Sequence, residues 1–424
     1  MKRFRIPPEG LSSKVAKLTF DIPIRAKIVF LTHHRMQKFI RDKTKRPKVP
    51  RVSIFLETAT SWGRRVVAGI LEHARSNGPW HIQIEPRGPD EPFHMPSRWE
   101  GDGIIARIST STMATSIANL GVPVVNITSI QIPGVNYPRI VTNPKASGRL
   151  AAELFWSRGF RDFGYVGNPD KDYVQAQFHA FEDVLSERGH TCAFFRESDN
   201  FTKLARWLSS LPKPAGVYCW GPNIGRRIID TCLEIGIDVP HDVSVLGADF
   251  DELLSEASNP PQSGIQIAAE QIGRTAGSML EGLMKGQPAP RLLTEIDPIG
   301  VISKLSTNTL AVEDPQMART VRYILAEAHN PITVSDVLRK NPMARRSLER
   351  NFRKIFGCSV AEQIRKTRID HARRLLATTN DPVTLIAERC GFSSYNYLSR
   401  VFREETGLSP RAFRARSLGE NYGQ

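Results

Sequence analysis

The stretch that decides the fold of the C-terminal part is Ile386-Ala387-Glu388-Arg389-Cys390-Gly391-Phe392-Ser393. It combines an apolar position with a glycine turn, and an apolar stride of four residues follows, with Leu398 and Phe402 leading to Gly407. The same order occurs earlier in the chain, in Leu338, Pro342-Met343-Ala344, Leu348, Phe352 and Gly357. Two copies of one pattern predict two structural units of the same kind.

The second copy predicts a helix-turn-helix. Asp381 is placed to cap a helix that begins at Pro382, Gly391 supplies the turn, and Ser393 is placed to cap the next helix. The outer face of that helix would contact bases in a major groove, where pairing of Asn with adenine and of Arg with guanine is favoured by geometry. The DNA-binding residues predicted here are Ser394, Tyr395, Asn396, Ser399 and Arg400.

The first copy predicts a second unit of the same kind. Its leading helix would bury Ile332, Val334, Val337 and Leu338. Its second helix carries four charged residues that we predict to face DNA, namely Arg345, Arg346, Glu349 and Arg350. A solvated charged face is the alternative, but the repeat and the positive charge favour DNA. Residues 359–379 predict one long helix between the copies, which would set their spacing.

Residues 313–416 resemble the DNA-binding domain of the AraC/XylS family of transcription regulators, in which such a helix joins two helix-turn-helix units. The most specific part of the resemblance is residues 386–393 with Tyr397–Arg403 and Gly407–Pro410. The first copy departs from the family pattern. It has Pro342 where the turn glycine usually stands and Ala344 at the usual serine cap, and a lost cap costs about 1 kcal/mol.

Charge is distributed unevenly along the 424 residues, whose formal net charge is +15. The balance of Lys and Arg against Asp and Glu is +12 in residues 1–51, −5 in residues 52–312 and +8 in residues 313–424. Two basic ends around a slightly acidic middle favour a module that binds nucleic acid, joined to one that does not. With the helix-turn-helix pattern, the expected partner is double-stranded DNA. A membrane-surface role is disfavoured.

The cysteines and apolar runs indicate a cytoplasmic protein without membrane spans. Five scattered cysteines, at positions 192, 219, 232, 358 and 390, show neither paired spacing nor histidine partners at zinc-ligand distance. No apolar run approaches the roughly 20 residues of a spanning helix. Residues 1–48 are basic and lack a sustained period, which predicts disorder. A basic arm on DNA phosphates, and a true start at Met36, are open alternatives.

From Arg51 onward, short apolar runs alternate with helical patterns. The predicted buried strands lie at residues 52–56, 81–85, 103–106, 122–126, 163–166, 215–218 and 243–247. The predicted helices lie at residues 62–76, 112–120, 144–158, 173–188, 223–236 and 268–285. Such alternation predicts parallel sheets covered on both faces, and its length suits two lobes. A ligand would then bind in the cleft beyond the carboxyl ends of the strands.

Residues 51–304 resemble the periplasmic-binding-protein-like sensor domain of LacI-type regulators. The resemblance rests on Gly101–Ala106, Val122–Val125, Phe163–Gly167 and Val243–Asp249. It implies an α/β two-lobed periplasmic-binding-protein-like sensor domain, followed by an all-α domain with two helix-turn-helix units. It also implies a regulator of carbohydrate-use genes whose effector is a small molecule, expected to be a sugar such as xylose.

Four residues are candidate ligand contacts: Trp62, Arg64, Gln177 and Asp249. Asp249 follows a strand and could accept two hydroxyl hydrogen bonds, although it could equally cap a helix. Trp62 could stack on the ligand or cover the core, and Arg64 could supply a donor fork. Sugar-binding relatives tend to have Arg at the position of Gln177, an acidic residue at Pro222 and Asn at Phe250. These departures leave the choice of sugar open.

The competing class of protein is an enzyme with an attached DNA-binding domain. We predict that the chain is not an enzyme. The glycines Gly101 and Gly103 precede a strand, whereas a dinucleotide fingerprint needs them after one. Asp249, Asp251 and Glu252 could hold Mg²⁺, but surface charge is the simpler interpretation, so neither a metal nor a cofactor is predicted.

The expected layout has five parts. They are a basic extension at 1–48, the sensor at 49–304, a linker at 305–316 where periodicity is lost, an AraC-type domain at 317–416 and a tail at 417–424. We expect a homodimer, because LacI-like sensors commonly pair, and RNA polymerase is a further candidate partner. The family resemblance implies an activator.

Overall fold

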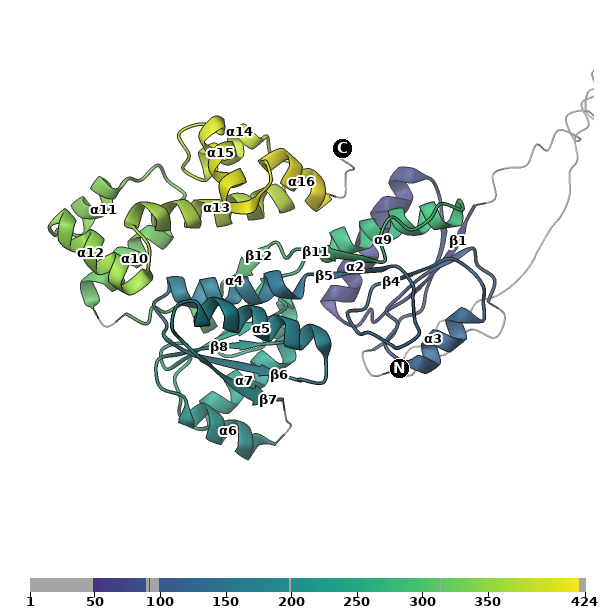
Figure 1. The fold of residues 1–424 in the computed structure, drawn as a ribbon, viewed down its shortest axis with the longest axis horizontal. Coiled ribbons are helices and arrows are strands. Elements are labelled where there is room, and N and C mark those ends of the chain that lie inside the picture. The colour runs from purple at the N-terminus through teal and green to yellow at the C-terminus, as the bar shows by residue number, and fades with distance from the viewer. Residues whose placement is uncertain (1–48, 89–90, 92–98, 198–199, 313, 419–424) are drawn as a thin grey trace, which may run out of the picture. The chain divides into compact units, whose positions relative to one another are not determined.

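The computed structural model describes residues 49–88, 91, 99–197, 200–312 and 314–418. The predicted basic extension at 1–48 lies outside the described residues, as do residues 419–424 of the tail. The first lobe is built on a six-stranded sheet with the strand order β11-β5-β4-β3-β1-β2 (Figure 1). All of its strand pairs are parallel. The strands are β1 (Arg51–Phe55), β2 (His81–Ile84), β3 (Gly103–Ala106), β4 (Val124–Asn126), β5 (Arg139–Thr142) and β11 (Leu293–Ile296).

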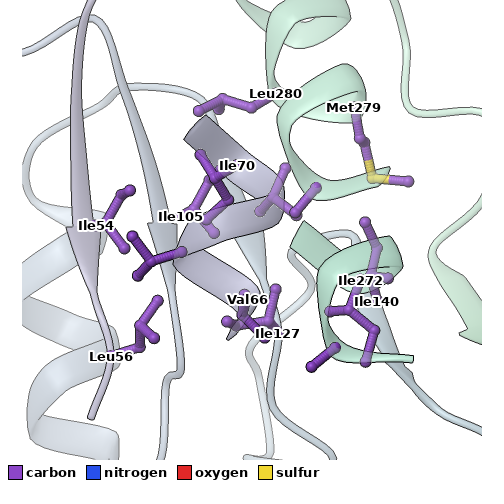
Figure 2. Packing of buried hydrophobic residues seen from close by; sticks show 14 of the residues in the cluster. Ile54, Leu56, Val66, Ile70, Ile105, Ile127, Ile140, Ile272, Met279 and Leu280 are labelled. Carbon is purple, nitrogen blue, oxygen red and sulfur yellow. The ribbon is translucent and has the colours of Figure 1, made fainter. Parts of the chain in front are cut away.

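Alternate residues of this sheet enter two separate cores. One core packs Ile54 and Ile105 against α2 (Ser61–Asn77) and α9 (Ala269–Met284), as Figure 2 shows for Val66, Ile70 and Leu280. The other packs Phe55 and Ile104 against α3 (Ser111–Ala118). Burial on both faces explains why these strands read as continuous apolar runs.

The second lobe is a six-stranded sheet with the order β12-β10-β9-β8-β6-β7. Its strands are β6 (Asp162–Gly167), β7 (Cys192–Arg196), β8 (Ala215–Cys219), β9 (Val243–Gly247), β10 (Ser263–Gln266) and β12 (Gly300–Ile302). Phe163 and Tyr165 pack on the side of α4 (Pro144–Ser157) and α5 (Asp172–Ser186). The opposite face packs on α6 (Phe201–Ser210) and α7 (Pro222–Glu234), and α8 (Glu252–Glu256) follows β9.

The two-lobed α/β fold confirms the class predicted from the sequence, with one correction to the sheet. Strand β12 runs antiparallel to β10, so the second sheet is mixed rather than parallel. Five strands were not predicted: β5, β7, β10, β11 and β12. They are short, and the burial of β7 and β11 is incomplete, so their sequences lack the apolar run of a central strand.

The C-terminal part is all helical, as predicted. Its helices are α10 (Pro315–Glu327), α11 (Val334–Lys340), α12 (Arg345–Phe356), α13 (Val360–Thr378), α14 (Val383–Arg389), α15 (Tyr395–Thr406) and α16 (Pro410–Leu418). One core surrounds Leu348 and Phe352 of the first unit, and another surrounds Leu398 and Phe402 of the second. The repeated apolar stride therefore marks equivalent core positions.

Residues of the predicted linker are not loosely held. Ser306 and Thr307 are fully buried in a short 3-10 turn, Leu305–Thr307. The Ser306 hydroxyl accepts a hydrogen bond from the backbone N–H of Ser263 (2.8 Å) and donates one to the carbonyl of Val245 (2.7 Å). Leu310 and Val312 pack against the core of the first helix-turn-helix unit.

Candidate functional site

The second helix-turn-helix unit consists of α14, a turn at Gly391 and α15. Gly391 has φ +72°, a left-handed conformation that favours glycine. Two predicted caps were wrong. Ser394 rather than Ser393 caps α15, through a hydrogen bond from the backbone N–H of Tyr397 (3.2 Å). Asp381 does not cap α14, whose N-cap is Pro382, because its carboxylate pairs with Arg389.

The outer face of α15 is open at the positions that the repeat predicted. Asn396 and Arg400 are exposed and Ser399 is partly exposed, whereas Tyr395 packs partly against the core of its own unit. Arg400 forms an ion pair with Glu404 one turn later (3.2 Å) and lies over the ring of Tyr397. The guanidinium is therefore oriented by its own helix but still accessible.

The first unit makes its turn without a left-handed glycine. Asn341 (φ −127°) and Pro342 take the place of the glycine turn, and the carbonyl of Pro342 accepts a hydrogen bond from the Gln316 side chain (3.0 Å). Ala344, as predicted, provides no side-chain cap for α12. Thr333 and Asp336 form a reciprocal capping box on α11. The turn is thus stabilised by the hydrogen bond from Gln316 of α10, and not by a side-chain cap on α12.

Helix α12 presents three of the four predicted DNA contacts to solvent. Arg345, Arg346 and Arg350 are exposed. Glu349 is partly buried, and its Oε2 has no hydrogen-bond partner among the described residues. The arginines are suited to DNA, and the role predicted for Glu349 remains a prediction.

A residue that the sequence analysis missed ties α13 to the loop between α10 and α11. Arg368 is only 8% exposed, and its guanidinium donates to the carbonyls of Ala328 (2.8 Å), Asn330 (2.8 Å) and Ile332 (2.9 Å). Burial lowers the pKa of Arg368. It stands at the four-residue stride between Ile364 and Ala372, so a charged residue on the apolar face of α13 was the available signal.

In the sensor, three charged side chains follow three neighbouring strands of the first lobe. Glu57 follows β1, Arg87 follows β2 and Arg107 follows β3. The buried Oε1 atom of Glu57 accepts from Nη1 of Arg107 (2.8 Å) and lies 3.3 Å from Nη2 of Arg87. The sequence analysis did not select these residues, because their proximity depends on the order of the strands.

Aromatic side chains lie at the strand ends of the second lobe. Tyr173, in the first turn of α5, meets the ring of Trp220 after β8 edge to face, with centroids 6.2 Å apart. The indole N–H of Trp220 donates to Glu197 (2.6 Å), which also pairs with Arg227 (3.5 Å). Burial raises the pKa of Tyr173, while the positive charge of Arg107 lowers it. Arg107 of the first lobe therefore lies near Tyr173 of the second.

Asp249 lies where β9 ends, as expected from the sequence. Its Oδ1 accepts from the backbone N–H of Phe250 (2.8 Å), while the cap of α8 is the neighbouring Asp251. Burial raises the pKa of Asp249 to about 7, against the opposing influence of nearby Arg65. Arg65 itself holds Glu270 with two hydrogen bonds of 2.8 Å. A proton-holding carboxyl group at a strand end can both donate to and accept from a hydroxyl.

The other three predicted ligand residues have different surroundings. Trp62 packs partly against the core of the first lobe. Arg64 is exposed and donates to the carbonyls of Thr58 (3.0 Å) and Ala59 (2.8 Å) in its own loop. Gln177 is a buried residue of α5, and its side-chain oxygen accepts from the hydroxyl of Tyr165 (3.2 Å). Their ligand contacts remain predictions.

No group of three or more His, Cys, Asp or Glu residues in the described part of the chain is arranged to hold a metal ion. No helix there is long and apolar enough to cross a membrane.

Two α/β lobes followed by paired helix-turn-helix units define a transcription regulator with a ligand-sensing domain and a DNA-binding domain. Residues 152–307 match the periplasmic binding protein-like domain family, and residues 338–416 match a helix-turn-helix domain family. The chain is a homologue of the xylose operon regulatory proteins. It is 26% identical over 383 residues to that of Escherichia coli (strain K12), covering 86% of this chain and 96% of the relative.

Two further comparisons agree with this assignment. The structure of the xylose-binding transcription activator xylR aligns with a TM-score of 0.55 and 26% identity, over 87% of this chain and 98% of that chain. The transcriptional activator RhaR of Yersinia pseudotuberculosis serotype O:1b (strain IP 31758) is 40% identical over 85 residues, which are 20% of this chain and 29% of the relative. The protein is therefore a homologue of DNA-binding transcription regulators, with a periplasmic-binding-protein-like domain and a helix-turn-helix domain.

Proposed function

We propose that a sugar binds between the strand ends of the two lobes and changes the affinity of the helix-turn-helix units for an operator. The observation that carries this proposal is the meeting of polar and aromatic side chains from both lobes, in which Arg107 lies near Tyr173 and Arg65 lies near Asp249. A carboxyl group with a neighbouring aromatic ring is a common combination for holding a sugar. The relatives named for xylose support the same ligand class.

Ligand binding can change DNA affinity only if the ligand prefers one arrangement of the protein over another. The test is titration calorimetry of the full chain with pentoses, hexoses and sugar acids, followed by operator binding with and without each sugar that binds. We expect at least one sugar to bind and to shift the operator dissociation constant. A sugar that binds without any shift would refute the coupling.

The binding residues that we propose are Asp249 and Trp62, with Arg64 and Gln177 as predicted contacts that have other partners in this arrangement. Asp249→Ala should weaken sugar binding, because it removes the carboxyl group at the end of β9. Retained affinity in that variant would remove Asp249 from the site. Trp62→Phe serves as the matched test of stacking.

On the DNA side, we propose that α12 and α15 read two successive major-groove segments about one helical turn, roughly 34 Å, apart. Exposed arginines on both helices support this. We further propose a homodimer, since two DNA modules then bind one operator with a raised effective concentration. Light scattering at micromolar concentration, with and without DNA, should give twice the chain mass of 47.5 kDa.

Three remaining aspects follow from the relatives. They are transcription regulators, so we propose that the chain has no enzymatic activity and acts in the cytoplasm, where its DNA target lies. We propose activation, with RNA polymerase as a partner, because two of the relatives are named as activators. Transcription in vitro from the operator, with and without the sugar, tests the direction of the effect.

A further inference from the structure

The two recognition helices are copies of one another in the same register. Helices α12 and α15 have 12 residues each, and each ends at a left-handed glycine, with φ +71° at Gly357 and +74° at Gly407. Their fully buried positions also correspond, namely Leu348 with Leu398 and Phe352 with Phe402. Equal positions in the two helices can therefore be compared one by one.

A single helix supports both units. The first half of α13 contributes Ile364 to the core around Leu348, and its second half contributes Ala372 and Leu376 to the core around Leu398. Both recognition helices are thus packed on the same helix with the same buried positions. We therefore expect equal positions of α12 and α15 to meet DNA in equivalent ways.

The second and sixth residues of each recognition helix lie one turn apart on its outer face. The sixth residue is arginine in both helices, Arg350 and Arg400, whereas the second residue is Arg346 in α12 and Asn396 in α15. All four residues are exposed. Side chains four positions apart have Cβ atoms about 5–6 Å apart, so they can reach base pairs one or two steps apart, at a rise of roughly 3.4 Å per step.

Arginine and asparagine differ in the base that they recognise in a major groove. The arginine fork donates two hydrogen bonds, to O6 and N7 of guanine. The asparagine amide donates to N7 of adenine and accepts from its N6 amino group. A contact to a phosphate carries no such sequence information. The two helices therefore present the same base-reading group at one position and different groups at the other.

We infer that the two operator segments share one guanine and differ at a second contacted base pair, one or two steps away. Arg350 and Arg400 read the shared guanine, one in each segment, about one helical turn apart. At the second base pair, Arg346 selects guanine and Asn396 selects adenine. This inference rests on the proposed function, in which α12 and α15 read two groove segments, and it names the bases in those segments.

The surroundings of the two shared arginines differ in one respect. Arg400 forms an ion pair with Glu404 (3.2 Å), whereas the equivalent residue of α12 is Lys354, whose like charge cannot hold Arg350. A side chain that is already oriented loses less conformational entropy when it binds. The shared guanine should therefore be selected more strongly in the segment that α15 contacts.

The experiment is a selection of tightly bound sequences by the full chain, from a pool of duplexes with about 30 random base pairs, which is room for two segments one turn apart. We expect the selected sequences to contain two guanines about 10 base pairs apart. One should be accompanied by a second preferred guanine and the other by a preferred adenine. Replacement of any of these four base pairs should weaken binding about 5- to 150-fold.

Two exchange variants test the assignment of residues to bases. Arg346→Asn should change the second preferred base of its segment from guanine to adenine, and Asn396→Arg should make the opposite change in the other segment. Arg353→Asn is the matched control, because Arg353 is also exposed but lies in the last turn of α12. It should weaken all sequences by a similar factor and leave the preferred bases unchanged. Thermal unfolding checks that each variant is folded.

The possible results separate this inference from the proposed function. Two selected segments without a repeated guanine would overturn the inference and leave the reading of two groove segments in place. If Arg346→Asn and Asn396→Arg weaken binding without changing the preferred bases, these two residues do not read bases and the assignment is wrong. If no sequence is enriched over the pool, the proposed sequence-specific binding of DNA fails as well.

Discussion

Gly391 of the second helix-turn-helix unit lies directly against Asn330, which belongs to the loop before α11 of the first. A Cβ atom added to Gly391 would stand 2.4 Å from the carbonyl oxygen of Asn330. The same carbonyl accepts a hydrogen bond from Arg368 of α13. The two units are therefore joined at the second turn as well as through the connecting helix, and a glycine there serves both the turn and the contact.

A substitution of Gly391 should lower the stability of the folded protein. Gly391→Ala would place a side chain at φ +72° and against a backbone carbonyl. We expect a loss of about 2–4 kcal/mol in the free energy of unfolding, of which about 1 kcal/mol comes from the left-handed conformation. Urea unfolding of the full chain, followed by a helical signal, measures it.

Gly407→Ala is the matched control, because Gly407 has φ +74° and open space at its Cβ position. It should lose only the conformational part, about 1 kcal/mol. Equal losses in the two variants would show that the approach of Asn330 contributes nothing.

Removal of the Arg368 guanidinium should loosen the first unit. Arg368→Met keeps the apolar length of the side chain but removes the guanidinium donor from three carbonyl groups, of which that of Asn330 keeps the backbone N–H of Ile332. We expect the free energy of unfolding to fall by about 2–4 kcal/mol and operator binding to weaken, because the position of α11 and α12 on α13 depends on these hydrogen bonds. Arg374→Met, at an exposed position of the same helix, should change stability by less than about 0.5 kcal/mol. A similar change in both variants would contradict the structural role.

The two recognition helices should read different bases. Arg350→Ala and Arg400→Ala are each expected to lose about 1–3 kcal/mol of sequence preference, at separate base pairs of the operator. A base-by-base series of operator variants measures the preference. We expect the sharper loss for Arg400, because the second turn has both its glycine and its serine cap. If both variants lose preference at the same base pairs, or at none, the proposal that α12 and α15 read two different groove segments is wrong.

Asp249 should make the sensor less stable as pH rises. Its pKa is raised by burial to about 7 from an ordinary value of 3.8, so the folded protein retains a proton that the unfolded chain has lost between these values. The free energy of unfolding should therefore fall from about pH 4 to about pH 7, by roughly 1–2 kcal/mol, since the group is only partly screened from water. Asp249→Asn should remove this slope. Parallel pH profiles for the two proteins would exclude Asp249 as the cause.

Sequence reasoning found the elements whose signal is local. The repeated stride located both helix-turn-helix units, and the apolar runs located β3 and β9 with correct ends. The cap at Ser393 was displaced by one residue, because adjacent serines are equivalent in sequence and only the backbone distinguishes them. Glu57, Arg87 and Arg107 were missed because they meet only through the strand order β3-β1-β2. Gln177 was predicted as a ligand contact from the family resemblance. Its hydrogen bond to Tyr165 was not predictable, because it depends on packing within the second lobe.

The buried turn at Leu305–Thr307 affects how such regulators can be recombined. Its Ser306 hydroxyl completes hydrogen bonds of β9 and β10, whereas Leu310 and Val312 pack with the helices that follow. A chimaera that exchanges sensors between DNA-binding modules should therefore be joined at residues 308–309. A junction placed before Leu305 would deprive the transplanted sensor of part of its own interior, and the hybrid would fail for reasons unrelated to signalling.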